Sequence, residues 1–164
     1  MNHDTPPLLL VEDDENDAFF FERALKKAGI AQSLRVVRDG QEAIHYLGGS
    51  GPFTDRSAHP LPQLVMLDLN LPVKNGLEVL KWLRSEAATQ NLVVIVLTSS
   101  VDVLDLHEAY ALGANSYLVK PSDPNELTGI LEVIKAYWLR LNAVPPLPDS
   151  NPRLRGALRR TRPA

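Results

Sequence analysis

Acidic residues stand directly after two short apolar runs of this chain. Glu12 and Asp13 follow the run at 8–11, and Asp68 follows the run at 64–67. Carboxylates held close together raise one another's pKa, so a cluster of them favours a bound cation. Mg²⁺ is a hard ion that takes oxygen ligands and needs few carboxylates. The four histidines share no spacing with these acids, which disfavours zinc or iron and leaves Mg²⁺ as the expected cofactor.

Two further residues extend this chemistry toward phosphoryl transfer. Next to a metal ion, a carboxylate can attack phosphorus while positive charge neutralises the oxygens of the transferring group. Lys120 follows the apolar run at 116–119 and could supply a second positive charge. Thr98 ends another apolar run and could donate a hydrogen bond to a phosphoryl oxygen. These residue types therefore indicate transfer of a phosphoryl group to an aspartate.

The elements that must position these groups alternate regularly between strands and helices. Each predicted strand is a short and nearly continuous apolar run, which indicates burial on both faces and a parallel sheet. Each strand is followed by apolar residues at helical spacing. The predicted strands span residues 8–11, 34–37, 64–67, 92–97 and 116–119. This order predicts an α/β, doubly wound (βα)5 fold with one five-stranded parallel sheet.

Acidic residues also mark the expected starts of several helices. Asp14 and Asp102 precede helical segments and offer a side-chain oxygen to the free backbone amides of the first turn. For the last helix, Asp123 is the predicted cap, and Glu126 lies three residues after it, as in a capping box. The apolar residues of that helix keep helical spacing as far as Leu141.

The carboxyl ends of parallel strands lie at one edge of a sheet, where open α/β sheets bind ligands. The motifs at these ends resemble the receiver domains of two-component response regulators. They are VEDD at 11–14, DLNLP at 68–72 followed by Gly76, TSS at 98–100 and YLVKP at 117–121. The resemblance covers residues 7–142. It implies a flavodoxin-like receiver fold and a phosphoryl group accepted from a histidine kinase.

The resemblance implies a role for each acid of the cluster. Asp68 would be the phosphoacceptor and a Mg²⁺ ligand. Asp13 would bind the ion directly, Glu12 would bind it through a water molecule, and Asn70 would offer its backbone carbonyl. Glu12 stands where many receivers have an aspartate. A longer acid that reaches metal-bound water suits that position.

The resemblance also implies roles for residues of the fourth and fifth strands. Lys120 would pair with the phosphoryl oxygens, and Thr98 would follow the phosphoryl group when it arrives. Tyr117 would rotate inward as Thr98 moves, so the two residues would form a switch. The bond from Lys120 to Pro121 would be cis, a conformation that proline makes accessible.

A finer resemblance is to single-domain response regulators that are paired with phytochrome-type histidine kinases. It rests on the Gly/Pro-rich loop at 48–62, on residues 68–72, and on a C-terminal Tyr137-Trp138 pair followed by Pro145-Pro146. It implies a sensor histidine kinase of phytochrome type as the partner.

The last helix also points to a partner surface. Trp138 and Leu141 lie beyond the length that five short strands need for cover, and exposed aromatic surface is typical of an interface. Tyr137, Trp138 and Leu141 are the interface candidates. We therefore expect a homodimer built on the fourth helix, the fifth strand and the fifth helix. Packing against the sheet accounts for the rest of that helix.

The composition bounds the organisation of the chain. The 164 residues include no cysteine, no signal peptide and no apolar run long enough to cross a membrane, which favours a cytoplasmic protein. We expect a disordered N-terminus at 1–6, a receiver domain at 7–143 and a flexible Pro/Arg-rich tail at 144–164. Residues 145–164 carry a net charge of +4, with Asp149 opposed by five arginines: Arg153, Arg155, Arg159, Arg160 and Arg162.

Two other functions compete with the signalling switch, and one output is not expected. No DNA-reading unit follows the predicted receiver, so we expect no transcriptional output in the same chain. A phosphatase with an aspartyl-phosphate intermediate would use the same aspartate, Mg²⁺ and lysine, but such enzymes typically carry an acid where this chain has Asn70. A receiver-like interaction module without phosphorylation is the third reading. The tail is either a solubilising extension or a binding site for nucleic acid, anionic lipid or an acidic partner.

Overall fold

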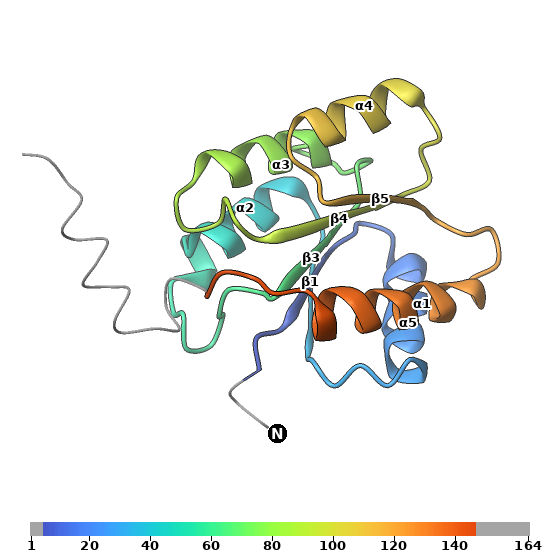
Figure 1. Ribbon diagram of the computed structural model, residues 1–164. Helices are drawn as coiled ribbons and strands as arrows, with labels where there is room; N and C mark the ends of the chain where they lie inside the picture. Colours follow the sequence, from blue (N-terminus) through green and yellow to red (C-terminus); the bar gives the residue numbers. More distant parts are fainter. Residues whose placement is uncertain (1–4, 147–164) are drawn as a thin grey trace, which may run out of the picture.

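The computed structural model describes residues 5–146 of the chain (Figure 1). The predicted segment 1–6 falls largely outside the described residues. Most of the predicted tail at 144–164, with its five arginines, lies outside them as well.

Strands and α-helices alternate along the described residues, and all strand pairs are parallel. The sheet has the order β2-β1-β3-β4-β5. The strands are β1 (Leu8–Val11), β2 (Leu34–Val37), β3 (Leu64–Leu67), β4 (Val93–Thr98) and β5 (Ser116–Val119). The helices are α1 (Glu15–Lys27), α2 (Gly40–Gly48), α3 (Gly76–Ser85), α4 (Val103–Ala111) and α5 (Glu126–Ile134). The predicted doubly wound (βα)5 fold is confirmed.

The sheet separates two apolar cores, because successive side chains of a strand point to opposite faces. In β1, Leu9 and Val11 pack on the face covered by α2, α3 and α4, whereas Leu8 and Leu10 pack on the face covered by α1 and α5. Figure 1 shows these two helical layers on either side of the sheet. Burial on both faces explains why the sequences of β1, β3 and β4 are almost continuously apolar.

The helix caps agree with prediction at two starts and differ at the last. Asp14 accepts hydrogen bonds from two amides in the first turn of α1, and Asp102 accepts one in α4. The α5 helix begins at Glu126, and no side chain caps it. Asp123 instead accepts a hydrogen bond from the backbone amide of Asn125 at 2.9 Å. This local turn competes with helix capping, so the predicted capping box does not form.

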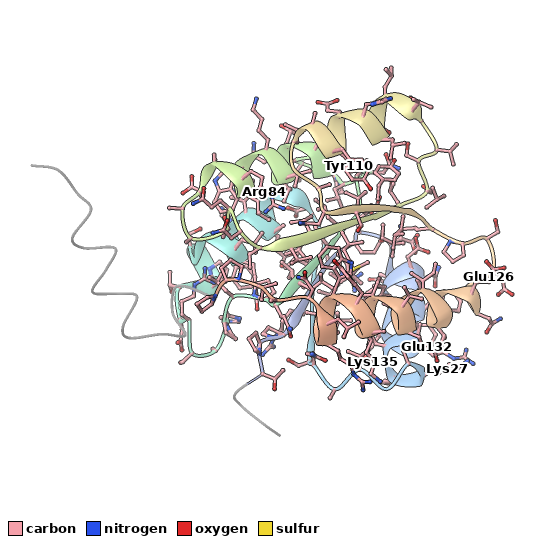
Figure 2. The ribbon with its side chains drawn as sticks, in the orientation of Figure 1. Lys27, Arg84, Tyr110, Glu126, Glu132 and Lys135 are labelled. Atoms are coloured by element: carbon pink, nitrogen blue, oxygen red, sulfur yellow. The ribbon has the colours of Figure 1, made fainter. Side chains whose placement is uncertain are left out.

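The predicted last helix extends to Leu141 but changes its hydrogen bonding on the way. After Ile134 the chain continues as a π-helical segment, η2 (Lys135–Leu141). The Asn142 amide donates to the Tyr137 carbonyl at 2.7 Å, a five-residue step. Lys135, labelled in Figure 2, donates from Nζ to the Ala28 carbonyl at 2.8 Å and so ties η2 to the end of α1.

The three aromatic and apolar residues expected at an interface differ in exposure. Tyr137 and Leu141 are 51% and 78% exposed. Trp138 is half-buried. It packs against the apolar core on the face of the sheet that α1 and α5 cover. The prediction that Trp138 lies beyond the core is therefore wrong, because η2 keeps this side chain on the face of α5 that covers the sheet.

The Gly/Pro-rich loop at 48–62 is packed against α2 and includes a short 3₁₀ helix, η1 (Gly51–Phe53). Arg56 donates to the backbone carbonyls of Tyr46, Leu47 and His59. Two of these carbonyls belong to the last turn of α2, where carbonyls lack helical partners.

Within the described residues, no helix has both the length and the apolar character that crossing a membrane requires.

Candidate functional site

The carboxyl ends of four strands bring the predicted functional residues to one edge of the sheet. Glu12 and Asp13 follow β1, Asp68 follows β3, Thr98 ends β4, and Lys120 follows β5. The sheet's hydrogen bonding continues just past these strand ends. The Asp68 amide donates to the Val11 carbonyl at 3.1 Å, and the Lys120 amide donates to the Thr98 carbonyl at 2.8 Å. The side chains therefore start from fixed backbone positions.

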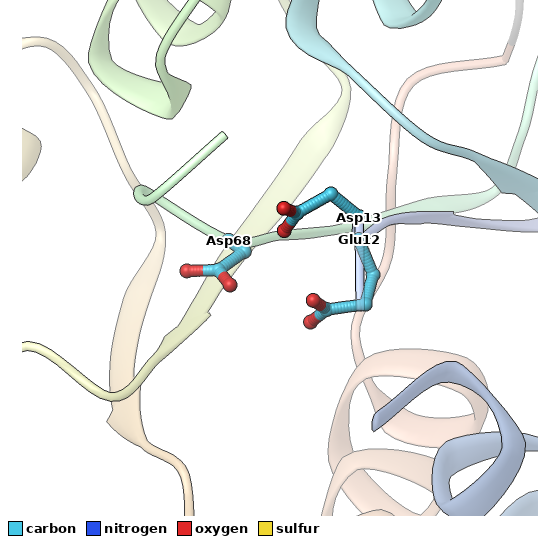
Figure 3. Close-up of side chains that lie close together, drawn as sticks. All are labelled: Glu12, Asp13 and Asp68. Atoms are coloured by element: carbon cyan, nitrogen blue, oxygen red, sulfur yellow. The ribbon is translucent and has the colours of Figure 1, made fainter. Parts of the chain in front are cut away.

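Three carboxylates form the acidic part of this site. Glu12, Asp13 and Asp68 each offer an oxygen, and these oxygens lie within 4.8 Å of one another. Figure 3 shows the three carboxylates turned toward a shared space. Glu12 and Asp68 are buried, whereas Asp13 is exposed and leaves the site open to solvent. Three carboxylate oxygens, one of them open to water, are suitable ligands for a hard divalent cation such as Mg²⁺, which keeps several water ligands.

Lys120 supplies the positive charge of the site. Its Nζ donates to Glu12 Oε2 at 2.6 Å, to Asp17 Oδ2 at 2.8 Å and to Asp68 Oδ2 at 2.8 Å. An ammonium group has three donors, so all three are used. Burial disfavours the charge of Lys120, but the hydrogen bonds to the three carboxylates outweigh it and raise the pKa of Lys120 above its ordinary value. The ammonium group therefore stays charged.

Glu12 is the most deeply buried acid of the site. Burial raises the pKa of the Glu12 carboxyl above its ordinary value, although the hydrogen bond and charge of Lys120 act in the opposite direction. The backbone amide of Asp14 also donates to Glu12 Oε1 at 3.1 Å. Because burial disfavours the charged form of this carboxyl group, a further cation at the site would stabilise that charged form.

The β4–α4 loop links Thr98 to Tyr117. Thr98 is fully buried, and its Oγ1 accepts a hydrogen bond from the Ser100 amide at 3.3 Å. The Tyr117 hydroxyl donates to the Ser100 carbonyl at 3.1 Å, while Ser100 Oγ donates to Asp105 of α4 at 2.6 Å. Burial raises the pKa of the Tyr117 hydroxyl. Ser100 therefore connects the edge of the sheet with both β5 and α4.

The loop after β3 holds Asp68 in place. The Asn70 amide donates to Asp68 Oδ1 at 3.1 Å. Gly76, at the start of α3, packs so closely that an added Cβ would lie 2.2 Å from the Asp68 carbonyl oxygen. Within this loop, Val73 has φ of +65°, a left-handed conformation that is strained for a β-branched residue. The loop is thus tightly constrained around the predicted phosphoacceptor.

The expected cis bond before Pro121 is not present. All peptide bonds of the described residues are trans. Proline narrows the preference for trans to about 0.5–1 kcal/mol but does not reverse it. With the trans bond, Lys120 still reaches the carboxylates of Glu12, Asp17 and Asp68.

Sequence reasoning missed one residue of this site. Asp17 lies in the first turn of α1 and pairs with Lys120, 103 positions further along the chain. A signal was available, because an acid in the first turn after the Asp14 cap must lie near the same end of β1. Nothing in the local sequence pattern indicated which basic side chain would pair with Asp17.

The order and geometry of these groups agree with one family of proteins. The family described as the response regulator receiver domain matches residues 8–132. The chain belongs to this family. The receiver domain is a two-component signalling module, and the predicted resemblance is confirmed at this level.

Three relatives show how far the likeness extends. FilR2 of Methanothrix harundinacea, a probable methanogenesis regulatory protein, is 37% identical over 84% of this chain and 86% of its own length. Rcp1 of Synechocystis sp. is 34% identical over 85% of this chain and 95% of its own length. A crystal structure of the Mn²⁺-bound form of response regulator Rcp1 gives a TM-score of 0.77 at 33% identity, over 86% of this chain and 99% of that one. The crystal structure of the phosphorylated cyanobacterial phytochrome response regulator RcpA gives a TM-score of 0.80 at 32% identity, over 87% of this chain and 99% of that one.

Proposed function

We propose that this receiver is a single-domain response regulator that accepts a phosphoryl group from a histidine kinase onto Asp68. One observation carries the proposal. Asp68 stands at the carboxyl edge of the sheet beside Glu12 and Asp13, and it accepts a hydrogen bond from the ammonium group of Lys120. This arrangement provides a nucleophilic carboxylate, ligands for a divalent cation and a fixed positive charge in one place.

In the proposed transfer, one Asp68 carboxylate oxygen attacks the phosphorus of a phosphohistidine. A P–O bond to Asp68 forms as the P–N bond to the kinase breaks, and the electron pair leaves with the imidazole. Asp13, Asp68, the Asn70 backbone carbonyl and, through water, Glu12 would hold Mg²⁺. When bound, Mg²⁺ supplies positive charge that neutralises the phosphoryl oxygens. Lys120 contributes a point charge to the same oxygens.

Thr98 and Tyr117 are proposed to report the phosphoryl group to the surface. Thr98 Oγ1 would turn toward a phosphoryl oxygen and release the Ser100 amide that it now accepts from. Ser100 also holds Tyr117 and α4, so a change at Thr98 reaches the surface of α4 and β5. The phosphorylated state thereby biases a two-state equilibrium of this surface.

The proposed partner is a phytochrome-type kinase. The likeness to RcpA over nearly the whole of that chain supports it, together with the loop at 48–62 that prompted the finer resemblance. Phosphotransfer from autophosphorylated kinases tests it. We expect transfer from a phytochrome-type kinase to be at least tenfold faster than from an unrelated kinase, and no transfer to Asp68→Asn. Equal rates from both kinases would contradict the choice of partner.

A homodimer on the α4–β5–α5 surface is proposed as the output state. Val119 of β5, Val133 of α5 and Leu104 of α4 are exposed alongside Tyr137 and Leu141. Exposed apolar residues on neighbouring elements are typical of an interface. The receiver would act in the cytoplasm and catalyse only its own phosphorylation and dephosphorylation. The receiver boundaries at 7–143, and a role of the tail as a flexible extension, belong to the same proposal.

A further inference from the structure

Asp17 is a fourth carboxylate of the site, and none of the proposed steps uses it. It reaches Lys120 from α1, whereas the other acids follow strands. Its side chain is 45% exposed, against 3% for Glu12 and 5% for Asp68. Asp17 also borders a pocket between α1 and α5, which Lys120 and Pro121 line as well. Asp17 therefore connects the ammonium group of Lys120 with solvent and with the first turn of α1.

The hydrogen bond to Asp17 occupies a donor that the phosphoryl group could use. The three donors of Lys120 are taken by Asp17, Glu12 and Asp68. Phosphorylation converts the Asp68 carboxylate to an acyl phosphate, in which the negative charge lies on the phosphoryl oxygens, so the Lys120 donor now bound to Asp68 passes to a phosphoryl oxygen. A phosphoryl group has several oxygens that accept hydrogen bonds. A second bond from Lys120 would require release of Glu12 or Asp17, and the half-exposed Asp17 is the easier of the two to return to water.

Asp17 also makes the site more negative than the predicted chemistry needs. Glu12, Asp13 and Asp68 together with Lys120 leave two negative charges, which one divalent cation cancels. Asp17 adds a third negative charge next to Lys120. This extra charge attracts a divalent cation and repels an anionic phosphoryl group, so the two affinities respond to it in opposite directions.

We infer that Asp17 is a positioning residue that holds Lys120 toward α1, lowers the affinity of the site for the phosphoryl group and raises its affinity for Mg²⁺. The inference rests on the proposed function. Asp17 would then shift the balance of this receiver toward the unphosphorylated state by restraining the lysine that the phosphoryl group must recruit.

The test uses Asp17→Asn, which keeps an oxygen that can accept from Lys120 and removes only the charge. Beryllofluoride serves as a mimic of the phosphoryl group, titrated by ¹⁹F NMR at saturating Mg²⁺, and Mg²⁺ alone is titrated by calorimetry. We expect Asp17→Asn to bind beryllofluoride about two- to fivefold more tightly and Mg²⁺ more weakly by about the same factor, the range for one partly exposed ion pair. Acetyl phosphate should also phosphorylate the variant faster.

The matched control is Glu15→Gln, which removes an exposed acid from the same first turn of α1. It should change both affinities by less than about 1.5-fold, because an exposed charge is screened by solvent and salt. Opposite shifts for anion and cation would not result from a general loss of structure. Asp17→Asn behaving like Glu15→Gln, or binding beryllofluoride less tightly than the wild type, would overturn the inference. Failure of the wild type to bind beryllofluoride at all would instead refute the proposed function.

Discussion

Among the described residues, Asp13 differs from the other acids of the site because no lysine pairs with it and it faces solvent. Lys120 pairs with Glu12 and Asp68, whereas Asp13 adds negative charge close to both. Without a cation this charge is repulsive, and with a divalent cation it becomes a ligand. The same residue is therefore expected to oppose folding in one condition and to support it in the other.

Asp13→Asn tests this double role. In EDTA we expect the free energy of unfolding to rise by about 0.3–1 kcal/mol, because a like-charge repulsion is removed. In Mg²⁺ the wild type should gain about 2.7 kcal/mol at a hundredfold excess over its dissociation constant, and the variant should gain little. Urea unfolding with and without Mg²⁺ measures both. A variant that is less stable than the wild type in EDTA would contradict the repulsion.

Glu12 makes the stability of the fold depend on pH in a defined direction. Burial raises its pKa in the folded state above the ordinary value of 4.5. Between 4.5 and the raised value the folded state binds more protons than the unfolded state, so this contribution to stability is present below 4.5 and is lost as the pH rises through the folded pKa. The cost above that pKa is what a bound cation would offset.

Glu12→Gln isolates this contribution, since glutamine does not titrate. In EDTA we expect the stability of the variant, relative to the wild type, to increase as the pH rises from 4.5 through the raised pKa of Glu12. Chemical unfolding at a series of pH values measures the difference. A difference that stays constant, or falls, across that window would show that burial does not govern the charge of Glu12.

At the scale of elements, the close contact between α3 and the end of β3 fixes the position of Asp68. Gly76 allows this contact, because a Cβ there would lie 2.2 Å from the Asp68 carbonyl oxygen. Gly129 in α5 makes a matched comparison, since a Cβ there would meet nothing within 4 Å. Both glycines lie in helices, but only one of them is required by packing.

Replacement of each glycine by alanine should therefore have opposite effects. Gly76→Ala should lower the free energy of unfolding by about 2 kcal/mol or more, since backbone must move to accept the methyl group. Gly129→Ala should raise it by about 0.5–1 kcal/mol, the gain of alanine over glycine inside a helix. Thermal and urea unfolding compare the two. A stable Gly76→Ala variant would mean that α3 can shift without cost.

The elements also show which features the sequence could predict. The central strands could be predicted because burial on both faces makes them almost continuously apolar. Leu8–Val11, Leu34–Val37, Leu64–Leu67 and Ser116–Val119 have the predicted bounds. The acids at their ends could be placed together by the rule for parallel sheets alone. Local patterns therefore determined the sheet and the edge at which the site lies.

The features that could not be predicted depend on long-range contacts or on competing local bonds. The pairing of Asp17 with Lys120 joins residues 103 positions apart. The packing of Trp138 on the core depends on the π-helical segment η2. Asp123 has two uses that fit the same sequence, a helix cap and a local turn, and only the folded chain shows that the turn forms.

At the scale of the whole molecule, the exposed surface of α4, β5, α5 and η2 is the expected output of the switch. Leu141→Glu places a charge on this surface at a residue that is 78% exposed, so the monomer should fold normally. We expect the variant to weaken dimerisation at least tenfold in sedimentation equilibrium with beryllofluoride, since a buried unpaired charge is costly at an interface. An unchanged dimer would place the interface elsewhere.

The central claim is that Asp68 accepts a phosphoryl group in a reaction that requires a divalent cation. Intact-mass spectrometry after incubation with acetyl phosphate tests it most directly, on the wild type and Asp68→Asn, with Mg²⁺ and with EDTA. We expect one added phosphoryl group on the wild type in Mg²⁺ and none in the other three samples. An adduct on Asp68→Asn or in EDTA, or no adduct on the wild type in Mg²⁺, would contradict the account.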